Sequence, residues 1–146
     1  MEPDHLTIRP VTDIDLAELL ALYDSVGWSA YTRQPAVLRA AVAGSSYVVI
    51  ARRGQRLVGL ARAVSDDATI CYLQDVLVAP DEQRTGIGRA LVAAVLDRYA
   101  AVRQKVLLTD DEPGQRAFYE SLGYQEAHDR DLRAFVRFDA DDTPDT

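Results

Sequence analysis

The sequence predicts a mixed α/β fold with a mostly antiparallel central sheet and helices on both of its faces. Three observations support this prediction. The chain has 146 residues, 48% of them apolar, which suffices for one buried core. Short β-branched runs alternate along the chain with segments whose apolar residues recur every three or four positions. Two of the apolar runs are joined by a short turn that contains glycine, which is typical of an antiparallel hairpin.

The first third of the chain predicts one strand and two helices. Leu6–Ile8 predicts a short strand, and Thr12–Asp15 supplies a cap with carboxylates at the start of a helix that Gly27 ends. The apolar residues of that helix are spaced for one buried face: Leu16, Leu19, Leu20 and Tyr23. Residues 28–34 predict a polar and aromatic loop. Residues 35–44 begin with Pro and end with Gly, as a short helix does.

The middle of the chain predicts three strands. Tyr47–Ala51 and Leu57–Ala61 are apolar runs rich in β-branched residues, and Gly54 lies in the turn between them, so we expect a hairpin. Asp66-Asp67 marks a second turn. A further strand is expected over Thr69–Val78.

The last third predicts two helices and two strands. Residues 87–99 carry apolar side chains at helical spacing, and Val106–Thr109 is a short apolar run. A helix is expected over Gln115–Leu122 because Gly123 supplies its end. Leu132–Phe138 is expected to form a closing strand.

Domain organisation and charge follow from composition. We expect one domain over residues 1–138 and a disordered acidic tail over residues 139–146, because the tail has Pro144, no large apolar residue and a cluster of acids. The tail contributes four aspartates to a formal charge of -7: Asp139, Asp141, Asp142 and Asp145. The mildly acidic remainder argues against a nucleic-acid partner, and local acidic surface could favour a cationic small molecule. A small-molecule amine is expected in preference to a protein substrate. A homodimer is left open.

Cysteine, histidine and hydropathy exclude further classes. One Cys cannot form an internal disulfide, and with two widely spaced histidines, His5 and His128, it offers no metal-ligand cluster, so no metal is expected. The sequence has no apolar run of membrane-spanning length and no basic start typical of a signal peptide. The sequence therefore predicts a cytoplasmic protein without a membrane partner.

The strongest local motif is Gln83-Arg-Thr-Gly-Ile-Gly-Arg-Ala90, between a predicted strand and a predicted helix. Gly86 and Gly88 allow backbone N–H groups to point toward one position, where the helix N-terminus adds positive potential. This pattern favours a phosphate cradle, and an ordinary tight turn is the alternative. A nucleoside-triphosphate loop is disfavoured because Arg89-Ala90 replaces its Lys-Ser/Thr pair. The dinucleotide pattern is disfavoured because Leu91 stands at its third glycine.

Two ordered motifs resemble those of the GNAT superfamily of acetyl-coenzyme A dependent N-acetyltransferases. The first is Gln83-Arg-Thr-Gly-Ile-Gly directly after the strand Leu73–Pro80. The second is Ala117-Phe-Tyr-Glu-Ser-Leu-Gly-Tyr124 downstream. The resemblance covers roughly residues 5–138 and implies a GNAT-like sheet that binds acetyl-coenzyme A.

The resemblance also implies roles for individual residues toward this cosubstrate. Backbone groups of Val76, Leu77 and Val78 would pair with the pantetheine arm at an incomplete sheet edge, and one amide would polarise the thioester carbonyl. The backbone of the phosphate turn would hold the pyrophosphate, through Arg84, Thr85, Gly86, Ile87, Gly88 and Arg89.

Tyr119 matches the family's proton donor to the departing thiolate. A phenol suits this role because it is neutral near pH 7. The alternative is that Tyr119 only packs its helix with Phe118 and Leu122. One departure from the family pattern is Glu112, where many relatives carry Asn seven residues before this Tyr.

The general base is the least defined role. Polyamine N-acetyltransferases of the superfamily have an adjacent Glu-Asp pair before the phosphate loop, and this chain has Gln74-Asp75 there. Gln74 cannot take a proton, so only Asp75 retains a carboxylate that could act as the base. An Asp in an apolar strand needs a partner. Asp75 could take the amine proton, or it could bond to backbone or to an Arg. Proton removal through water, with no dedicated base, also stays open.

The acceptor side is expected in the loop that contains Trp28 and Tyr31, because the corresponding segment covers the acceptor site in relatives. Aromatic rings there can enclose an amine's apolar body or stack on its cation. The resemblance thus implies acetyl transfer to a primary amine by direct attack in a ternary complex. One alternative is a non-catalytic sensor of acyl-coenzyme A, and another is a different acyl donor.

Overall fold

The computed structural model describes residues 5–139 and contains a five-stranded sheet in the order β1-β2-β3-β4-β5. The strands are β1 (Leu6–Val11), β2 (Tyr47–Arg53), β3 (Arg56–Ser65), β4 (Ile70–Val78) and β5 (Gln104–Leu107). β1 to β4 are antiparallel neighbours, and β4 pairs with β5 in parallel. The predicted mixed, mostly antiparallel sheet is confirmed.

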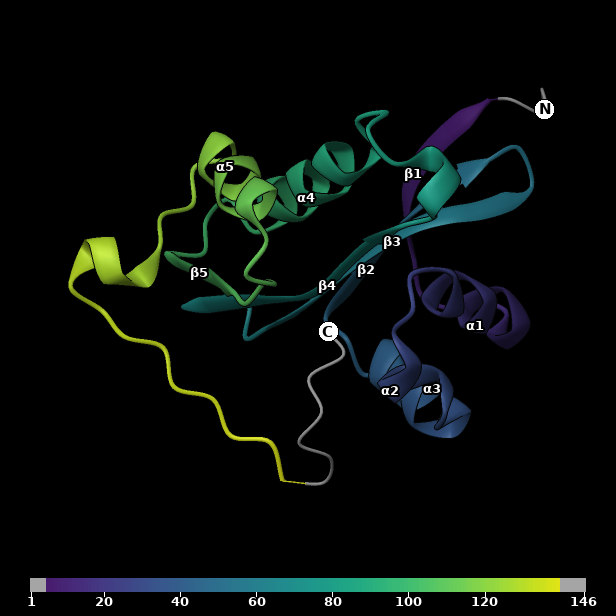
Figure 1. Ribbon diagram of the computed structural model, residues 1–146, viewed down its shortest axis with the longest axis horizontal. Coiled ribbons are helices and arrows are strands. Elements are labelled where there is room, and N and C mark those ends of the chain that lie inside the picture. The colour runs from purple at the N-terminus through teal and green to yellow at the C-terminus, as the bar shows by residue number, and fades with distance from the viewer. Residues whose placement is uncertain (1–4, 140–146) are drawn as a thin grey trace. The chain divides into compact units, whose positions relative to one another are not determined.

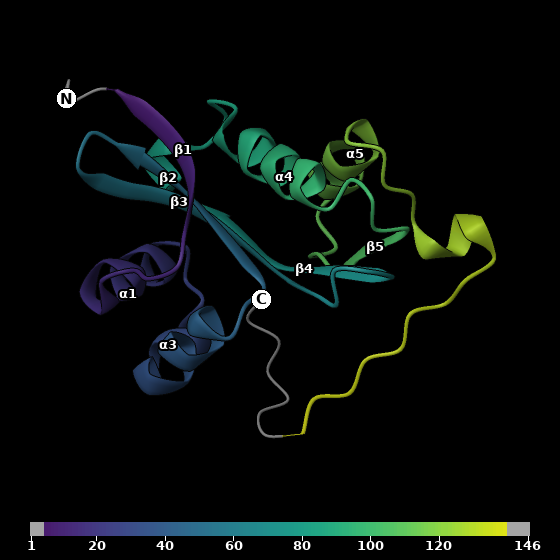
Figure 2. The same ribbon diagram turned by 180° about the vertical axis from the view of Figure 1, so that it is seen from behind.

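Helices cover both faces of this sheet. The helices are α1 (Leu16–Ser25), α2 (Ser29–Thr32), α3 (Pro35–Ala43), α4 (Ile87–Arg98) and α5 (Pro113–Ser121), with short 3-10 turns η1 (Pro80–Glu82) and η2 (Ala127–Arg130). α1 contacts β3 and β4, whereas α4 packs on β2, β3 and β4. Figures 1 and 2 show α1 and α3 on one side of the sheet and α4 on the other.

The chain divides into two compact units, one that ends at Leu108 and one that begins at Thr109. The first unit contains the whole sheet with α1 to α4, and the second contains α5 and η2. The single domain expected over residues 1–138 stays a prediction. The acidic tail lies outside the described residues except for Asp139, which accepts a 2.7 Å hydrogen bond from Arg137 Nε.

The first unit is built around an apolar core between the sheet and its helices. Asp15 caps α1 by accepting a hydrogen bond from the Glu18 amide at 3.2 Å. The helix then turns its buried face to the sheet. The largest fully buried side chains include Leu19, Tyr23, Leu38, Ile50, Leu60, Leu91 and Val95. Of the residues predicted for the buried face of α1, Leu19 and Tyr23 are fully buried and Leu16 and Leu20 partly so, while Leu22, which the spacing did not single out, is also buried.

A glycine sets the distance between α4 and the sheet. A Cβ added at Gly59 on β3 would lie 3.1 Å from both Ile87 Cγ2 and Leu91 Cδ1. Because glycine lacks that atom, the first turns of α4 approach the strand closely. The start of α4, which follows the glycine-containing turn, is thereby fixed over the middle of the sheet.

One predicted loop contains a helical turn. Residues 28–34 were expected to be irregular, and α2 occupies part of them. The Trp28 carbonyl accepts hydrogen bonds from the amides of Tyr31 and Thr32 at 3.1 and 3.4 Å. The Trp28 and Tyr31 rings also pack against Tyr23 of α1, at centroid distances of 5.8 and 5.1 Å. These ring contacts pack α2 against α1.

The expected closing strand over Leu132–Phe138 is wrong. No residue there is in a strand, and large apolar side chains such as Phe135, which is 90% exposed, point away from any core. β-propensity expresses only how well a side chain fits a sheet surface, and a strand also needs a partner. The expected strand over Val106–Thr109 is observed slightly earlier, as β5.

Three chemical features of the described residues complete the fold. No helix within residues 5–139 is long and apolar enough to cross a membrane. In the same range no group of three or more His, Cys, Asp or Glu side chains could hold a metal ion. Cys71 is a free, buried side chain of β4, 2% exposed.

Candidate active site

A β-bulge in β4 creates the first part of the site. Arg62 on β3 pairs with Asp75 and Ala63 pairs with Leu73, so Gln74 is the extra residue of the bulged strand. Bulges change the direction of side chains locally. Here both Gln74 and Asp75 reach Tyr31 of α2. The Gln74 amide donates to the Tyr31 hydroxyl at 3.2 Å, and that hydroxyl donates to Asp75 Oδ1 at 2.9 Å.

Asp75 is the buried centre of this polar cluster. Asp75 is 1% exposed. Its Oδ2 atom accepts hydrogen bonds from Arg62 Nε at 2.6 Å and from the Tyr23 hydroxyl at 2.8 Å. Arg62 is itself 6% exposed, and its guanidinium also contacts Ser45 Oγ at 3.3 Å. The pair is an ion pair withdrawn from water, with hydrogen bonds that offset part of the cost of desolvation.

The electrostatics of the cluster keep its phenols neutral. Burial raises the pKa of Tyr23, and the nearby Asp75 carboxylate raises it further. The same two causes, in the same order, raise the pKa of Tyr31. For Arg62, burial opposes the charge, but the Asp75 carboxylate outweighs it and raises the pKa of the guanidinium. Arg62 is therefore a permanent cation facing a carboxylate and two neutral hydroxyls.

No role in the site was predicted for Arg62, and Tyr23 was expected only on the buried face of a helix, whereas both donate hydrogen bonds to Asp75. The sequence left open that Asp75 bonds to an Arg, and the structure shows that it does, with Arg62 as the partner. A signal was present, because Arg62 interrupts the apolar run of β3 just as Asp75 interrupts that of β4. Two opposite charges in adjacent apolar strands indicate a buried pair. Proton removal by Asp75 stays a prediction.

Three aromatic rings pack together at the cluster. Trp28 and Tyr31 are both half-buried, and their ring centroids lie 6.1 Å apart with an interplanar angle of 35°. Tyr23 lies beneath them and is 0% exposed. The predicted substrate residues Trp28 and Tyr31 are therefore brought together with Asp75.

The second part of the site is the outer half of β4. The parallel pairing of β4 with β5 covers only Ile70–Leu73 against Gln104–Leu107. Val76, Leu77 and Val78 pair with β3 on one side, and within residues 5–139 no strand pairs with them on the other. This is the incomplete sheet edge that the family resemblance implied. Such an edge offers backbone groups to an amide-bearing ligand, as in β-strand addition.

The third part is the turn from Gln83 to Gly88. Arg84 has φ +67° and Gly86 has φ +87°, so two left-handed residues reverse the chain before α4. Two side chains stabilise the turn. The Thr85 hydroxyl donates a hydrogen bond to the Glu82 carbonyl at 2.6 Å, and the side-chain amide of Gln83 donates one to the Val78 carbonyl at 3.2 Å. The positive φ at Gly86 gives a physical reason for glycine at this position.

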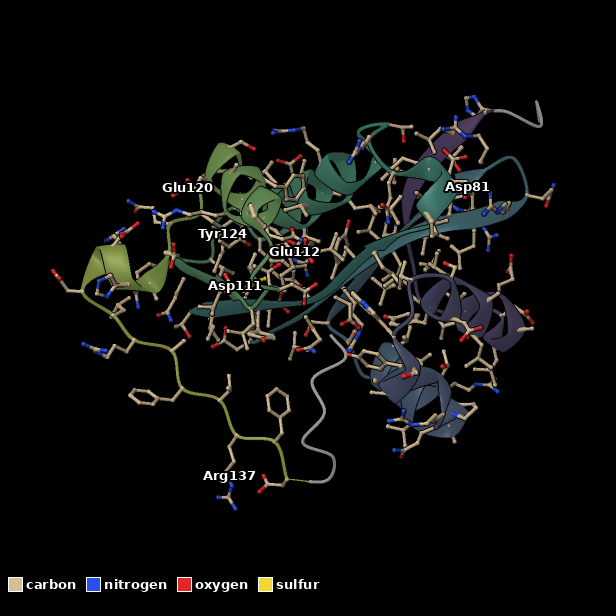
Figure 3. All side chains as sticks on the ribbon, in the orientation of Figure 1. Asp81, Asp111, Glu112, Glu120, Tyr124 and Arg137 are labelled. Atoms are coloured by element: carbon tan, nitrogen blue, oxygen red, sulfur yellow. The ribbon has the colours of Figure 1, made fainter. Side chains whose placement is uncertain are left out.

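Two ion pairs tie η1, which precedes the turn, to the β2–β3 hairpin. Arg53 donates to both oxygens of Glu82 at 2.9 and 3.3 Å, and Arg56 to both oxygens of Asp81 at 2.7 and 2.9 Å. Figure 3 labels Asp81 on this short helix. Bidentate pairs fix orientation as well as distance. The turn is thus anchored by residues outside it.

The amide groups at the start of α4 have no side-chain cap, since Gly86 occupies the N-cap position. The first amides of a helix lack intrahelical partners and carry the positive end of the helix dipole. The first intrahelical bond here runs from the Ala90 amide to the Gly86 carbonyl at 3.1 Å. Gly88 lies inside the first turn of α4 with helical backbone. The turn and the helix start together suit an anion such as a phosphate.

Tyr119 lies on α5, in the second unit. Its ring makes edge contacts with Phe118 and Tyr124 at 4.9 and 5.8 Å. Burial raises the pKa of Tyr119, and the Asp110 carboxylate raises it further, so the phenol keeps its proton at neutral pH. Within the described residues its hydroxyl makes no hydrogen bond, which leaves the proton available to another group.

The acidic run ahead of α5 is exposed. Asp111 and Glu112 lie in the segment that leads into the helix (Figure 3), and Glu112 stands at its N-cap without a side-chain capping bond. The backbone carbonyl of Glu112 instead accepts a hydrogen bond from the Gln115 backbone amide at 3.0 Å. Nothing in this geometry gives the Glu112 side chain a role toward a ligand.

The parts of the first unit define a class of site. A backbone anion cradle at a helix start, beside an unpaired strand edge, suits a ligand that carries both phosphate and amide groups. Comparison with known proteins agrees with this class. Residues 19–139 match the family model described as an acetyltransferase (GNAT) domain. The chain belongs to the GNAT family of acetyltransferases, which confirms the family resemblance predicted from the two motifs.

Individual relatives support the same family. The chain is 32% identical over 127 residues to the histone acetyltransferase TAP1 of Glycine max, a match that covers 77% of this chain and 53% of the relative. Its structure resembles that of the GNAT family acetyltransferase SP0256 from Streptococcus pneumoniae TIGR4 with a TM-score of 0.82, 28% identity, and coverage of 94% and 100% of the two chains. The chain spans about half to two thirds of the length of the curated relatives it matches.

A more distant neighbour shares the fold. The aminoglycoside N-acetyltransferase AAC(6')-Iy, solved in complex with CoA, superposes with a TM-score of 0.69 at 16% identity and covers 92% of this chain and 94% of its own. The predicted fold class is thus confirmed twice, by the sheet itself and by the neighbours.

Proposed function

We propose that this protein transfers the acetyl group of acetyl-coenzyme A to a primary amine by direct attack in a ternary complex. The observation that carries the proposal is the left-handed Gly86 turn, which leads into an uncapped helix start beside an unpaired strand edge. Membership of the GNAT family supports the acetyl-coenzyme A part. A neighbour of the same fold was solved with CoA.

The residues of the turn and the edge would hold the cosubstrate. Backbone N–H groups from Arg84 to Arg89 would bind the pyrophosphate, and backbone groups of Val76 to Val78 would bind the pantetheine amides. Side chains contribute little to such binding. The residues therefore fit the group by the chemistry of their backbone donors, and no metal is part of the proposal.

The chemistry needs one bond made, one broken and two protons placed. The amine nitrogen attacks the thioester carbonyl carbon, which a β4 amide polarises, and the carbon–nitrogen bond forms as the carbon–sulfur bond breaks. Tyr119 donates its proton to the departing thiolate, and the motif match supports this role. The proton of the attacking amine passes to a base or to water, and the phenolate of Tyr119 regains a proton from solvent.

Acetyl transfer to a panel of amines, followed by release of free thiol, tests the proposal. The panel should include an aralkylamine, a polyamine, an amino acid and an N-terminal peptide, with Gly86→Val as a control that cannot form the turn. We expect thiol release that depends on both the amine and the intact turn. Absence of release with every member would contradict the enzymatic proposal.

A thermal-shift series with several acyl-coenzyme A donors separates the alternatives. A ligand that binds only the native state raises the unfolding temperature. A shift with acetyl-coenzyme A, without turnover, would favour a sensor. A larger shift with another acyl donor would change the proposed donor and leave the site unchanged.

A further inference from the structure

We propose that the Tyr31 oxygen recognises the acceptor as a hydrogen-bond donor, and that the buried Arg62–Asp75 pair is a positioning device that fixes the direction of the Tyr31 proton. The inference rests on the proposed function, because it concerns the acceptor amine of that reaction. It gives Asp75 an indirect role, through Tyr31, in place of direct contact with the substrate.

Asp75 is poorly placed to contact a substrate. Its side chain is 0% exposed and its two oxygens already accept hydrogen bonds from Arg62, Tyr23 and Tyr31. A base that removes a proton must reach the donor within hydrogen-bond distance, directly or through one water. Tyr31 and Gln74 are half-buried, whereas Asp75, Arg62 and Tyr23 are buried, and the Tyr31 ring lies 6.1 Å from that of Trp28.

The hydroxyl of Tyr31 has a defined hydrogen-bond polarity. A hydroxyl carries one proton and two lone pairs. The proton is donated to Asp75 Oδ1 at 2.9 Å, and one lone pair accepts the Gln74 amide at 3.2 Å. The other lone pair has no protein donor within residues 5–139. Because the proton points inward, this hydroxyl can offer an outside group only an acceptor, and it therefore binds a hydrogen-bond donor such as the N–H of an amine.

The charge of the cluster narrows the acceptor class. Arg62 neutralises Asp75 at 2.6 Å, so the cluster presents no net charge beneath the aromatic rings. Recognition then depends on one neutral oxygen and on the faces of Trp28 and Tyr31. An amine with one nitrogen and an apolar or aromatic body fits these features. A polyamine would need carboxylates that this cluster does not leave free.

Two tyrosines in the cluster provide a matched pair of variants. Tyr23 and Tyr31 each donate one hydrogen bond to Asp75, but Tyr23 is 0% exposed in the core, whereas Tyr31 is half-buried. Tyr23→Phe and Tyr31→Phe therefore each remove one hydrogen bond from Asp75, the first from Oδ2, which keeps Arg62, and the second from Oδ1. Only Tyr31→Phe removes an oxygen that an acceptor could touch.

Binding can be followed without turnover. Trp28 is the only tryptophan of the chain, so intrinsic fluorescence reports on this site. Phenethylamine is titrated into the protein in the presence of CoA, with spermidine as the comparison ligand. We expect phenethylamine to bind more tightly than spermidine. Tyr31→Phe should raise its Kd about tenfold, as expected for one lost hydrogen bond, while Tyr23→Phe lowers the unfolding temperature and changes Kd less than about twofold.

Turnover supplies a second readout. With acetyl-coenzyme A, Tyr31→Phe should raise the KM for phenethylamine about tenfold and leave kcat nearly unchanged, because the lost contact serves binding. A general base would behave differently, since its loss lowers kcat and removes the acidic limb of the pH–rate profile.

Several outcomes would overturn the inference. They are equal losses of amine affinity in both tyrosine variants, binding of spermidine as tight as that of phenethylamine, and no amine-dependent change of fluorescence in the parent. Failure of the proposed function has another signature. Amine binding that Tyr31→Phe weakens, without thiol release from acetyl-coenzyme A in the parent, would contradict the activity and support the recognition role of Tyr31.

Discussion

The cluster around Asp75 and the turn around Gly86 lie in the same unit but are built from different chemical groups. The cluster consists of side chains from α1, α2, β3 and β4, which meet across separations of up to 52 residues. The turn consists of consecutive backbone whose course depends on positive φ at Arg84 and Gly86. The cluster is therefore sensitive to side-chain chemistry, and the turn to backbone conformation.

The largest expected effect is the loss of one partner from the buried ion pair. Arg62→Met leaves the Asp75 carboxylate without its cation in a site that is 1% exposed. We expect the free energy of unfolding to fall by about 3–5 kcal/mol, as for other buried pairs with one partner removed. Chemical denaturation measures the change.

Two matched variants sharpen this prediction. The double variant Arg62→Met with Asp75→Leu should recover much of the stability, because it removes both charges. Arg56→Met breaks the exposed pair with Asp81, whose side chains are 53% and 62% exposed, and should change stability little. Equal effects of Arg62→Met and Arg56→Met would show that burial does not distinguish the pairs.

The next effect concerns rate alone. Tyr119→Phe should slow acetyl transfer about 100-fold, because it removes the proposed general acid, and should leave CoA affinity nearly intact. Steady-state rates and calorimetry measure the two quantities. Tyr124→Phe, on a neighbouring ring, is the control and should keep the parental rate. Turnover of Tyr119→Phe within a few-fold of the parent would give Tyr119 a packing role only.

The pH dependence of the Tyr119 step has a definite sign. The pKa of Tyr119 is raised above its ordinary value of 10.0 by burial and then by Asp110, so the protonated form persists to higher pH. The rate advantage of the parent over Tyr119→Phe should therefore be retained up to pH 10 and lost only above it. A loss of that advantage between pH 7 and 9 would contradict the assignment.

Substitutions of the two glycines separate backbone strain from ligand contact. Gly86→Val places a β-branched residue at φ +87°, which costs about 1–3 kcal/mol and should abolish CoA binding. Gly88→Ala lies in helical backbone, where alanine is favoured by about 1 kcal/mol, so the protein should become more stable. If phosphate approaches this turn, Gly88→Ala should nevertheless weaken CoA binding. Calorimetry and thermal unfolding of both variants decide, and unchanged affinity in both would remove the cradle.

The smallest effect is expected at Thr85. Thr85→Ala removes the 2.6 Å hydrogen bond to the Glu82 carbonyl, which lies at an exposed turn. CoA affinity should change less than about threefold, because the cradle uses backbone groups and a single exposed hydrogen bond contributes little. A loss as large as that of Gly86→Val would mean that a side chain, and not the backbone, holds the ligand.

Local chemistry by itself determined much of this protein. The Asp15 cap, the apolar spacing of α1 and α4, the hairpin at Gly54 and the Gly86 turn are each set by a few neighbouring residues, and all were predictable from the sequence. The two motifs predicted the GNAT family, and the comparisons with known proteins confirmed it. Interactions within one turn or one hairpin depend on sequence spacing, and spacing is visible in a single chain.

Tertiary structure decided the rest. The bulge at Gln74, the pairing of Arg62 with Asp75 and the end of β4–β5 pairing at Leu73 depend on strand register, which no local pattern fixes. The helical turn α2 was missed because the rings of Trp28 and Tyr31 pack on Tyr23 of the preceding helix. Leu132–Phe138 was wrongly expected to be a strand because strand formation requires a partner strand. A buried charge reveals in sequence that it needs a partner, but only the folded chain shows which residue meets it.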